Sequence, residues 1–147
     1  MSNEDISQRM STLTHEFKVR VRFSEIDALK MVWHGSYVTY LEDAREAFGI
    51  KYGIGYMTIF NNGYFAPVYD LHIHYRHTAG LNDKLLVKIT YIPKPGGKLC
   101  FEYEIRNVET GDLLLTATSV QLFTTVDGEF DPQPQWFEDW KETIINA

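Results

Sequence analysis

The fold is decided by a stretch near the start of the chain, residues 16–53, EFKVRVRFSEIDALKMVWHGSYVTYLEDAREAFGIKYG. Its first part alternates apolar and charged residues up to Phe23, which is the pattern of a strand with one buried and one wet face. Its last part spaces apolar residues three and four apart, as one face of a helix requires. These residues are Tyr37, Tyr40, Leu41, Ala44, Ala47 and Phe48. The stretch therefore predicts a strand that begins near Thr14 and a helix over 37–52.

The two ends of this helix have recognisable signals. Ser36 is expected to be the N-cap, because its hydroxyl can accept a hydrogen bond from the free amides of the first turn. Gly49 or Gly53 is expected to end the helix in a left-handed conformation.

The rest of the chain is strand-like. Alternating apolar residues predict strands over 69–75, 84–91 and 99–105, and a less regular one within 113–125. Two glycine-containing turns, at 93–98 and 107–112, predict antiparallel hairpins. The order of strand, helix and four or so hairpin-linked strands predicts an α+β fold with the helix on a curled antiparallel sheet. Such a sheet has open edges, so we expect a homo-oligomer.

Length and composition narrow the class of protein. With 147 residues, 44% hydrophobic and 23% charged, the chain is predicted to form one globular domain over 14–147 after a flexible tail, 1–13. A net charge of −6 argues against nucleic acid as a partner. A single cysteine, Cys100, and a polar start without a secretory core predict a cytoplasmic protein. No apolar run is long enough to cross a membrane.

The connector between the first strand and the helix, residues 22–37, carries the densest group of reactive side chains. Phosphate-loop, dinucleotide-binding, nucleophile-elbow and zinc-helix signatures are absent from the sequence. The connector holds Glu25, Asp27 and His34 just before the predicted helix start. An aspartate with a reference pKa of about 3.9 is ionised at neutral pH, so Asp27 can attack or accept a proton. Backbone amides at a helix start can hold an oxygen that becomes negative.

The run R-F-x-E-x-D-A-x-x-M-V-W-H-x-x-Y-x-x-Y-x-E-x-A-R, residues 22–45, resembles the signature of the 4-hydroxybenzoyl-CoA thioesterase and YbgC-like acyl-CoA thioesterase family. The likeness continues more weakly over most of residues 15–125. It implies the hotdog fold, in which an antiparallel sheet wraps one long central helix. It also implies hydrolysis of an acyl-CoA to a carboxylic acid and coenzyme A, without a further cofactor, in a homodimer or homotetramer with sites at the subunit interface.

The resemblance also implies residue roles. Asp27 would act either as a nucleophile that forms a mixed anhydride or as a base that activates water. The backbone N–H of His34 would donate to the thioester oxygen, and its ring would position water or the acyl group. Substrate contacts would come from Gly35, Ser36, Tyr37 and Lys98. Lys98 lies beside the glycine turn, where it would meet the negative phosphates of coenzyme A.

Three questions stay open at this point. One alternative is a noncatalytic hotdog module that binds an acyl or aromatic ligand. Another is a metal-dependent enzyme, because Asp70, His72 and His74 share one strand face, although we predict no metal site. The acyl group is also undecided, since the aromatic residues after the helix would fit a pocket or a core; these are Tyr52, Tyr56, Phe60 and Tyr64.

Overall fold

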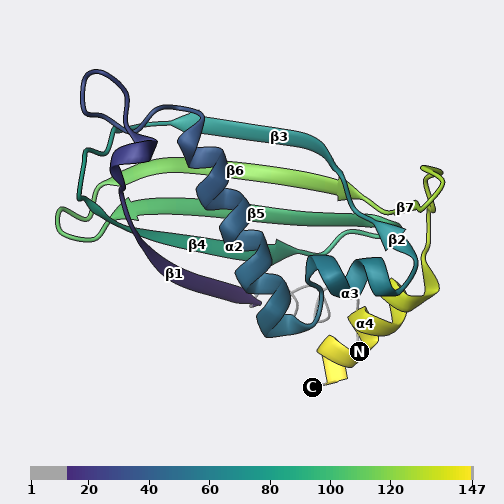
Figure 1. The fold of residues 1–147 in the computed structure, drawn as a ribbon. Helices are drawn as coiled ribbons and strands as arrows, with labels where there is room; N and C mark the ends of the chain where they lie inside the picture. Colours follow the sequence, from purple (N-terminus) through teal and green to yellow (C-terminus); the bar gives the residue numbers. More distant parts are fainter. Residues whose placement is uncertain (1–12, 147) are drawn as a thin grey trace.

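The computed structural model describes residues 13–146 (Figure 1), so the predicted tail lies outside the described residues except for Leu13. The elements in chain order are β1 (Thr14–Arg20), a 3-10 turn η1 (Phe23–Glu25), α2 (Ser36–Tyr52), α3 (Tyr56–Asn61), β2 (Tyr64–Phe65), β3 (Val68–Tyr75), β4 (Lys84–Ile92), β5 (Lys98–Asn107), β6 (Leu113–Leu122), β7 (Thr124–Thr125) and α4 (Gln135–Asn146). The predicted long helix and strands are all present.

The strands form a five-stranded antiparallel sheet in the order β1-β4-β5-β6-β3, with a small second sheet of β2 and β7. The main sheet curls around α2 (Figure 1), which confirms the predicted α+β hotdog arrangement. The β4–β5 and β5–β6 hairpins are as predicted. The expectation that β3 and β4 are also a hairpin is wrong, because β3 pairs with β6 and β4 pairs with β1. The segment between β3 and β4 instead contacts the connector, through Ala79 and Gly80.

The core lies between the concave face of the sheet and one side of α2. The buried side chains of α2 are Tyr37, Tyr40, Leu41, Ala44 and Phe48. Phe48 is fully buried and meets Phe101 edge to face, with ring centroids 5.0 Å apart. Each large apolar side chain buried in this way contributes about 1.5–3 kcal/mol. The periodicity of α2 thus fixes the helix on the sheet and sets where its two ends lie.

Glycines shape both ends of α2. Gly53 ends the helix with φ +74°, as predicted. Gly49 lies inside the helix, and a Cβ there would stand 2.4 Å from the Cα of Gly55. Glycine at position 49 therefore allows the segment after α2 to turn back and pack against the helix. The N-cap position belongs to Gly35, whereas Ser36 is the first helical residue. The prediction for Ser36 is wrong because its hydroxyl donates to the carbonyl oxygen of Glu25, 3.0 Å away.

The first strand is shorter than its alternation predicts. Val21 is fully buried, but the chain turns into η1 directly afterwards and leaves Phe23 79% exposed. The turn closes because a carboxylate oxygen of Glu25 accepts the backbone N–H of Arg22 at 2.7 Å. This reversal starts the connector that leads to α2. Within residues 13–146, no helix combines the length and the apolar character needed to span a membrane.

Candidate active site

The connector lies at one end of the sheet, between the end of β1 and the start of α2 (Figure 1). Its two halves pair with each other through a bridge between Ile26 and Val32. Its outer part pairs with the β3–β4 segment, where Val32 donates its N–H to the carbonyl oxygen of Ala79 at 2.8 Å. The connector is therefore a fixed loop that pairs with itself and with the β3–β4 segment.

Asp27 is exposed at the start of the tip of this loop. Its Oδ1 accepts the backbone N–H groups of Leu29 and Met31, at 2.8 and 3.3 Å. Its own N–H donates to the carbonyl oxygen of Met31. The other carboxylate oxygen, Oδ2, has no hydrogen-bond partner within the described part of the chain. The carboxylate is thus oriented through one oxygen while the other remains available.

His34 and Gly35 lead into α2. The carbonyl oxygen of His34 accepts the hydroxyl of Tyr75 at 2.8 Å, while its exposed ring lies beside Trp33, with ring centroids 4.9 Å apart. The first helical amide, that of Ser36, donates to Trp33. The N–H groups of His34 and Gly35 have no acceptor among residues 13–146. Two free donors therefore precede the positive end of the α2 dipole.

The Trp33 ring leaves no room for a side chain at position 35, which is glycine. A Cβ at this position would stand 2.2 Å from the ring of Trp33. The indole lies against the helix start while staying about half exposed. A side chain at position 35 would displace the indole or the turn that carries the two free amides.

Ser36 and Tyr37 are occupied in holding the connector. The Ser36 hydroxyl donates to Glu25, as described above. Tyr37 is buried, and its hydroxyl oxygen accepts the N–H of Ala79 at 3.2 Å. Burial raises the pKa of Tyr37, which keeps its hydroxyl protonated. Both side chains therefore form hydrogen bonds that hold the connector in place.

Lys98 lies far from the connector within one chain. It is the exposed first residue of β5 and pairs with Leu122. Arg106 lies near the other end of β5, where β4 begins beside the last residue of β1, Arg20. Ten strand residues span about 30 Å. The structure therefore does not bring Lys98 and Asp27 of one chain together.

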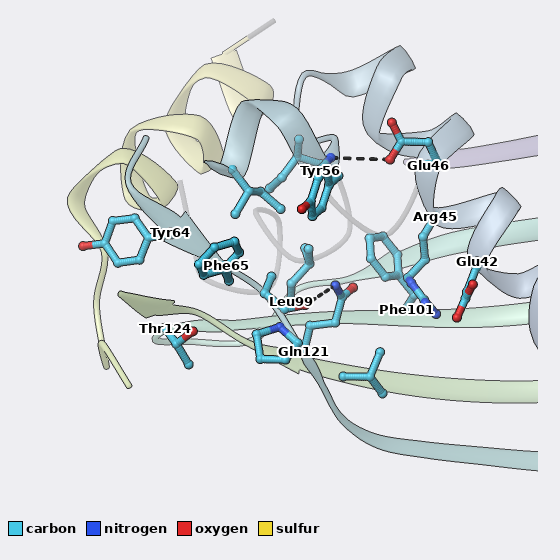
Figure 2. Close-up of a pocket in the computed structure, with 15 residues that line it drawn as sticks. Glu42, Arg45, Glu46, Tyr56, Tyr64, Phe65, Leu99, Phe101, Gln121 and Thr124 are labelled. Atoms are coloured by element: carbon cyan, nitrogen blue, oxygen red, sulfur yellow. Dashed lines mark hydrogen bonds between the residues drawn. The ribbon is translucent and has the colours of Figure 1, made fainter. Parts of the chain in front are cut away.

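A cavity of about 700 Å³ lies at the opposite end of α2 from the connector. Figure 2 shows it between α2, the α3–β2 segment and the sheet. Its apolar lining includes Ile54, Ile59, Tyr64, Phe65, Ala66, Pro67, Val68, Leu99 and Phe101. None of the predicted site residues lines it. Sequence reasoning missed the cavity, although Tyr56 and Tyr64, singled out as aromatic residues after the helix, belong to its wall.

The charged residues of the cavity all come from α2. Glu42, Arg45 and Glu46 follow each other along its helical face (Figure 2). Arg45 donates to the hydroxyl of Tyr103 at 3.3 Å, and Glu46 accepts the N–H of Tyr56 at 3.4 Å. Arg45 has no carboxylate partner within 4 Å in the described chain. The cavity thus combines an apolar interior with one charged wall.

The face of β3 with Asp70, His72 and His74 does not group these three side chains as ligands of one ion. All three residues are exposed on β3, and the two imidazole rings are 5.7 Å apart. Within residues 13–146, no three side chains of the ligating kinds come close enough to hold an ion.

Comparisons with known proteins agree with this architecture. The sequence profile of the thioesterase-like superfamily matches residues 21–140. YneP of Bacillus subtilis (strain 168), whose name proposes acyl-CoA thioesterase activity, is 29% identical over 133 residues, which cover 88% of this chain and 94% of YneP. The DHNA-CoA thioesterase structure from Staphylococcus aureus is 27% identical, with a TM-score of 0.80, over 88% of this chain and 87% of that chain.

A 1,4-dihydroxy-2-naphthoyl-CoA thioesterase structure from Synechocystis has a TM-score of 0.78 and 21% identity over 87% of this chain and 95% of its own, which supports the fold. The sheet curled around one helix defines the protein as a hotdog-fold protein. More specifically, the chain belongs to the thioesterase-like superfamily. The predicted family and the predicted class of enzyme, a thioester hydrolase, are thereby confirmed.

Proposed function

We propose that the protein hydrolyses an acyl-CoA to a carboxylic acid and coenzyme A with Asp27 and the start of α2. The observation that carries this proposal is the pairing of two features on one fixed connector. An exposed carboxylate is oriented by two backbone amides, and the next turn has two N–H groups without acceptors, those of His34 and Gly35. One group can attack or activate water, and the other two can hold the carbonyl oxygen.

The reaction follows from these groups. The thioester oxygen gains negative charge when its carbon is attacked, and free amides at a helix start stabilise that charge. Asp27 either attacks the carbon itself, giving a mixed anhydride that water then cleaves, or takes a proton from the attacking water. In both routes the carbon–sulfur bond breaks, the thiolate of coenzyme A takes up a proton, and water supplies the elements of the acid. No further cofactor is needed.

A second copy of the chain would complete the site. β3 is an edge strand that exposes Val68, Tyr69 and Tyr75, each at least 44% accessible. Antiparallel pairing of two β3 edges would place the Tyr75 end of one copy against the Val68 end of the other. Tyr75 holds His34 and Val68 lines the cavity, so the connector of one copy would face the cavity of its partner.

This homodimer, alone or doubled into a tetramer, accounts for the other predicted contacts. The cavity would take the acyl group, because its interior is apolar and it is large enough for a small molecule. Lys98 lies at the cavity end of its own chain, and pairing would turn that end toward the connector of the other copy. We place the reaction in the cytoplasm, in keeping with the single buried thiol of Cys100.

The test is a thiol-release assay with a panel of acyl-CoAs. Wild type should turn over at least one of them, and Asp27→Asn should lower kcat by roughly 10²–10⁴-fold. Asp43→Asn, an exposed aspartate on α2, is the matched control and should keep full activity. No thiol release by wild type, or full turnover by Asp27→Asn, would show that the assignment is wrong. Binding of acyl-CoA without turnover would favour the noncatalytic module.

A further inference from the structure

Glu25 is a buried carboxylate that the proposed reaction does not use. Only 8% of the residue is exposed, although it sits in a loop. Its Oε1 accepts two hydrogen bonds, from the backbone N–H of Arg22 at 2.7 Å and the hydroxyl of Tyr40 at 2.9 Å. Its Oε2 accepts the guanidinium of Arg22 at 3.2 Å. A buried charge is costly unless it is paired and hydrogen-bonded, and these three hydrogen bonds provide that compensation for Glu25.

The backbone of Glu25 holds the far side of the connector. Its carbonyl oxygen accepts the N–H of Trp33 at 2.9 Å and the hydroxyl of Ser36 at 3.0 Å. Its side chain is bonded to Tyr40, which lies one turn further along α2. One residue therefore fixes the beginning of the Asp27 loop, the end of that loop and the first turn of the helix to one another.

From this arrangement we infer that Glu25 is the positioning residue that sets the Asp27 carboxylate against the free amides of His34 and Gly35. The inference rests on the proposed function. Reaction between groups on two segments requires their separation to be fixed, and a displacement of about 1 Å can cost 10²-fold in rate. Glu25 is the residue that joins those two segments.

A carboxylate suits this place better than an amide. Every group that points at the Glu25 side chain is a donor: the Arg22 N–H, the Arg22 guanidinium and the Tyr40 hydroxyl. A glutamine has one acceptor oxygen and an NH₂ group, which would have to face one of these donors. Glu25→Gln therefore keeps the volume of the side chain but weakens the hydrogen bonds that Glu25 accepts from Arg22 and Tyr40.

The test compares Glu25→Gln and Tyr40→Phe with Glu16→Gln, an exposed glutamate on β1 that serves as the control. Glu25→Gln should lower kcat by about 10²-fold with KM changed less than about two-fold. Tyr40→Phe removes one of the three donors and should lower kcat by a smaller factor. Glu16→Gln should match wild type. A full kcat in Glu25→Gln, or a loss of rate that only parallels a loss of folded protein, would overturn the inference.

A second measurement does not depend on turnover. The amides of Leu29 and Met31 donate to Asp27, so their hydrogen exchange reports how firmly the loop is held. Their exchange should be faster in Glu25→Gln and in Tyr40→Phe than in Glu16→Gln. Unchanged exchange in the first two variants would overturn the role of Glu25 even in an inactive protein. Lack of wild-type activity would instead count against the proposed function alone.

Discussion

The two ends of α2 are built in opposite ways. The connector at its start is one continuous segment that is fixed by hydrogen bonds and leaves Asp27 exposed. The cavity near its other end is mostly apolar and is assembled from residues between 42 and 124 that belong to several elements. A single turn of the chain can position a few reacting atoms. A cavity, in contrast, needs walls from segments that are distant in sequence. In the proposed reaction, the groups that would react therefore lie at one end of α2 and the surface that would recognise the acyl chain lies at the other.

This separation predicts that changes at the two ends of α2 have different effects on kcat and KM. Changes at the connector should alter kcat for every acyl group alike, because in the proposed reaction the Asp27 carboxylate and the amides would contact only the thioester. Changes at the cavity should alter KM or kcat/KM according to the acyl group, because the cavity lining would contact only the chain. A variant that violates this division would show that the two ends are not distinct.

Among the variants that test this division, the largest effect is expected from Gly35→Ala. The added Cβ would stand 2.2 Å from the Trp33 ring, so the ring or the turn that carries the free amides must move. We expect kcat to fall by about 10²-fold, which is the effect of removing one oxyanion donor. Steady-state kinetics with a short and a long acyl-CoA should give the same factor for both.

The double variant Trp33→Ala with Gly35→Ala provides the control, because removal of the indole makes room for the new methyl group. It should recover part of the lost rate. A Gly35→Ala protein that is fully active, or one impaired with only one of the two substrates, would break the proposed division.

A smaller and selective effect is expected from Ala66→Leu in the cavity. The side chain lines the cavity, and three added carbons would occupy part of its volume. Differences of one methylene in an apolar pocket change specificity by about 10-fold or more. The kcat/KM for the longest accepted acyl-CoA should fall by at least about 10-fold, while that for the shortest should stay constant. Equal losses across a chain-length series would exclude the cavity as the acyl site.

The same contrast explains what the sequence could and could not reveal. The strand that begins at Thr14 and the helix that ends at Gly53 follow from local periodicity and from a glycine in the left-handed region. Asp27 and His34 lie seven residues apart, so a motif can carry both. The pairing of β3 with β6 joins residues 40 to 53 positions apart, from Tyr75 with Leu115 to Val68 with Gln121, and no local pattern encodes it.

The sequence could show that Glu25 is unusual, but it could not show which residues its side chain contacts. If the alternation of residues 17–23 continued, it would point the Glu25 side chain toward the apolar side, where an unpaired carboxylate is unfavourable. The sequence does not reveal that Tyr40, fifteen residues later, provides the compensating hydroxyl. Likewise the cavity wall brings Glu46 next to Tyr56 only because Gly49 and Gly55 allow a close turn.

A weaker effect is expected from Lys98→Glu. In the proposed dimer this lysine would meet a phosphate of coenzyme A at the surface, where charge pairs contribute about 0.2–1 kcal/mol. KM for acyl-CoA should rise about two- to five-fold, and added salt should shrink the difference. Acyl N-acetylcysteamine thioesters, which carry no phosphate, should react equally with wild type and variant. Lys18→Glu, on the outer face of β1, should have no such effect.

The smallest effect concerns acid stability and again contrasts the two ends. Burial raises the pKa of Glu25, but the bonds from the Arg22 amide, Tyr40 and the Arg22 guanidinium outweigh it and leave the pKa below its ordinary value. At the cavity end, the Tyr64 hydroxyl and the backbone N–H of Gln133 lower the pKa of the partly exposed Asp131. A lowered folded-state pKa gives stability that is present above the unfolded value, about 4.3 for glutamate, and is lost as pH falls through the folded value. Melting temperatures between neutral pH and pH 3 should therefore fall less steeply in Glu25→Gln than in wild type.

Asp131→Asn should change this fall in melting temperature less than Glu25→Gln does, because solvent screens the interactions of Asp131. A larger change in Asp131→Asn would show that the cavity end, and not the connector, contributes more to acid stability.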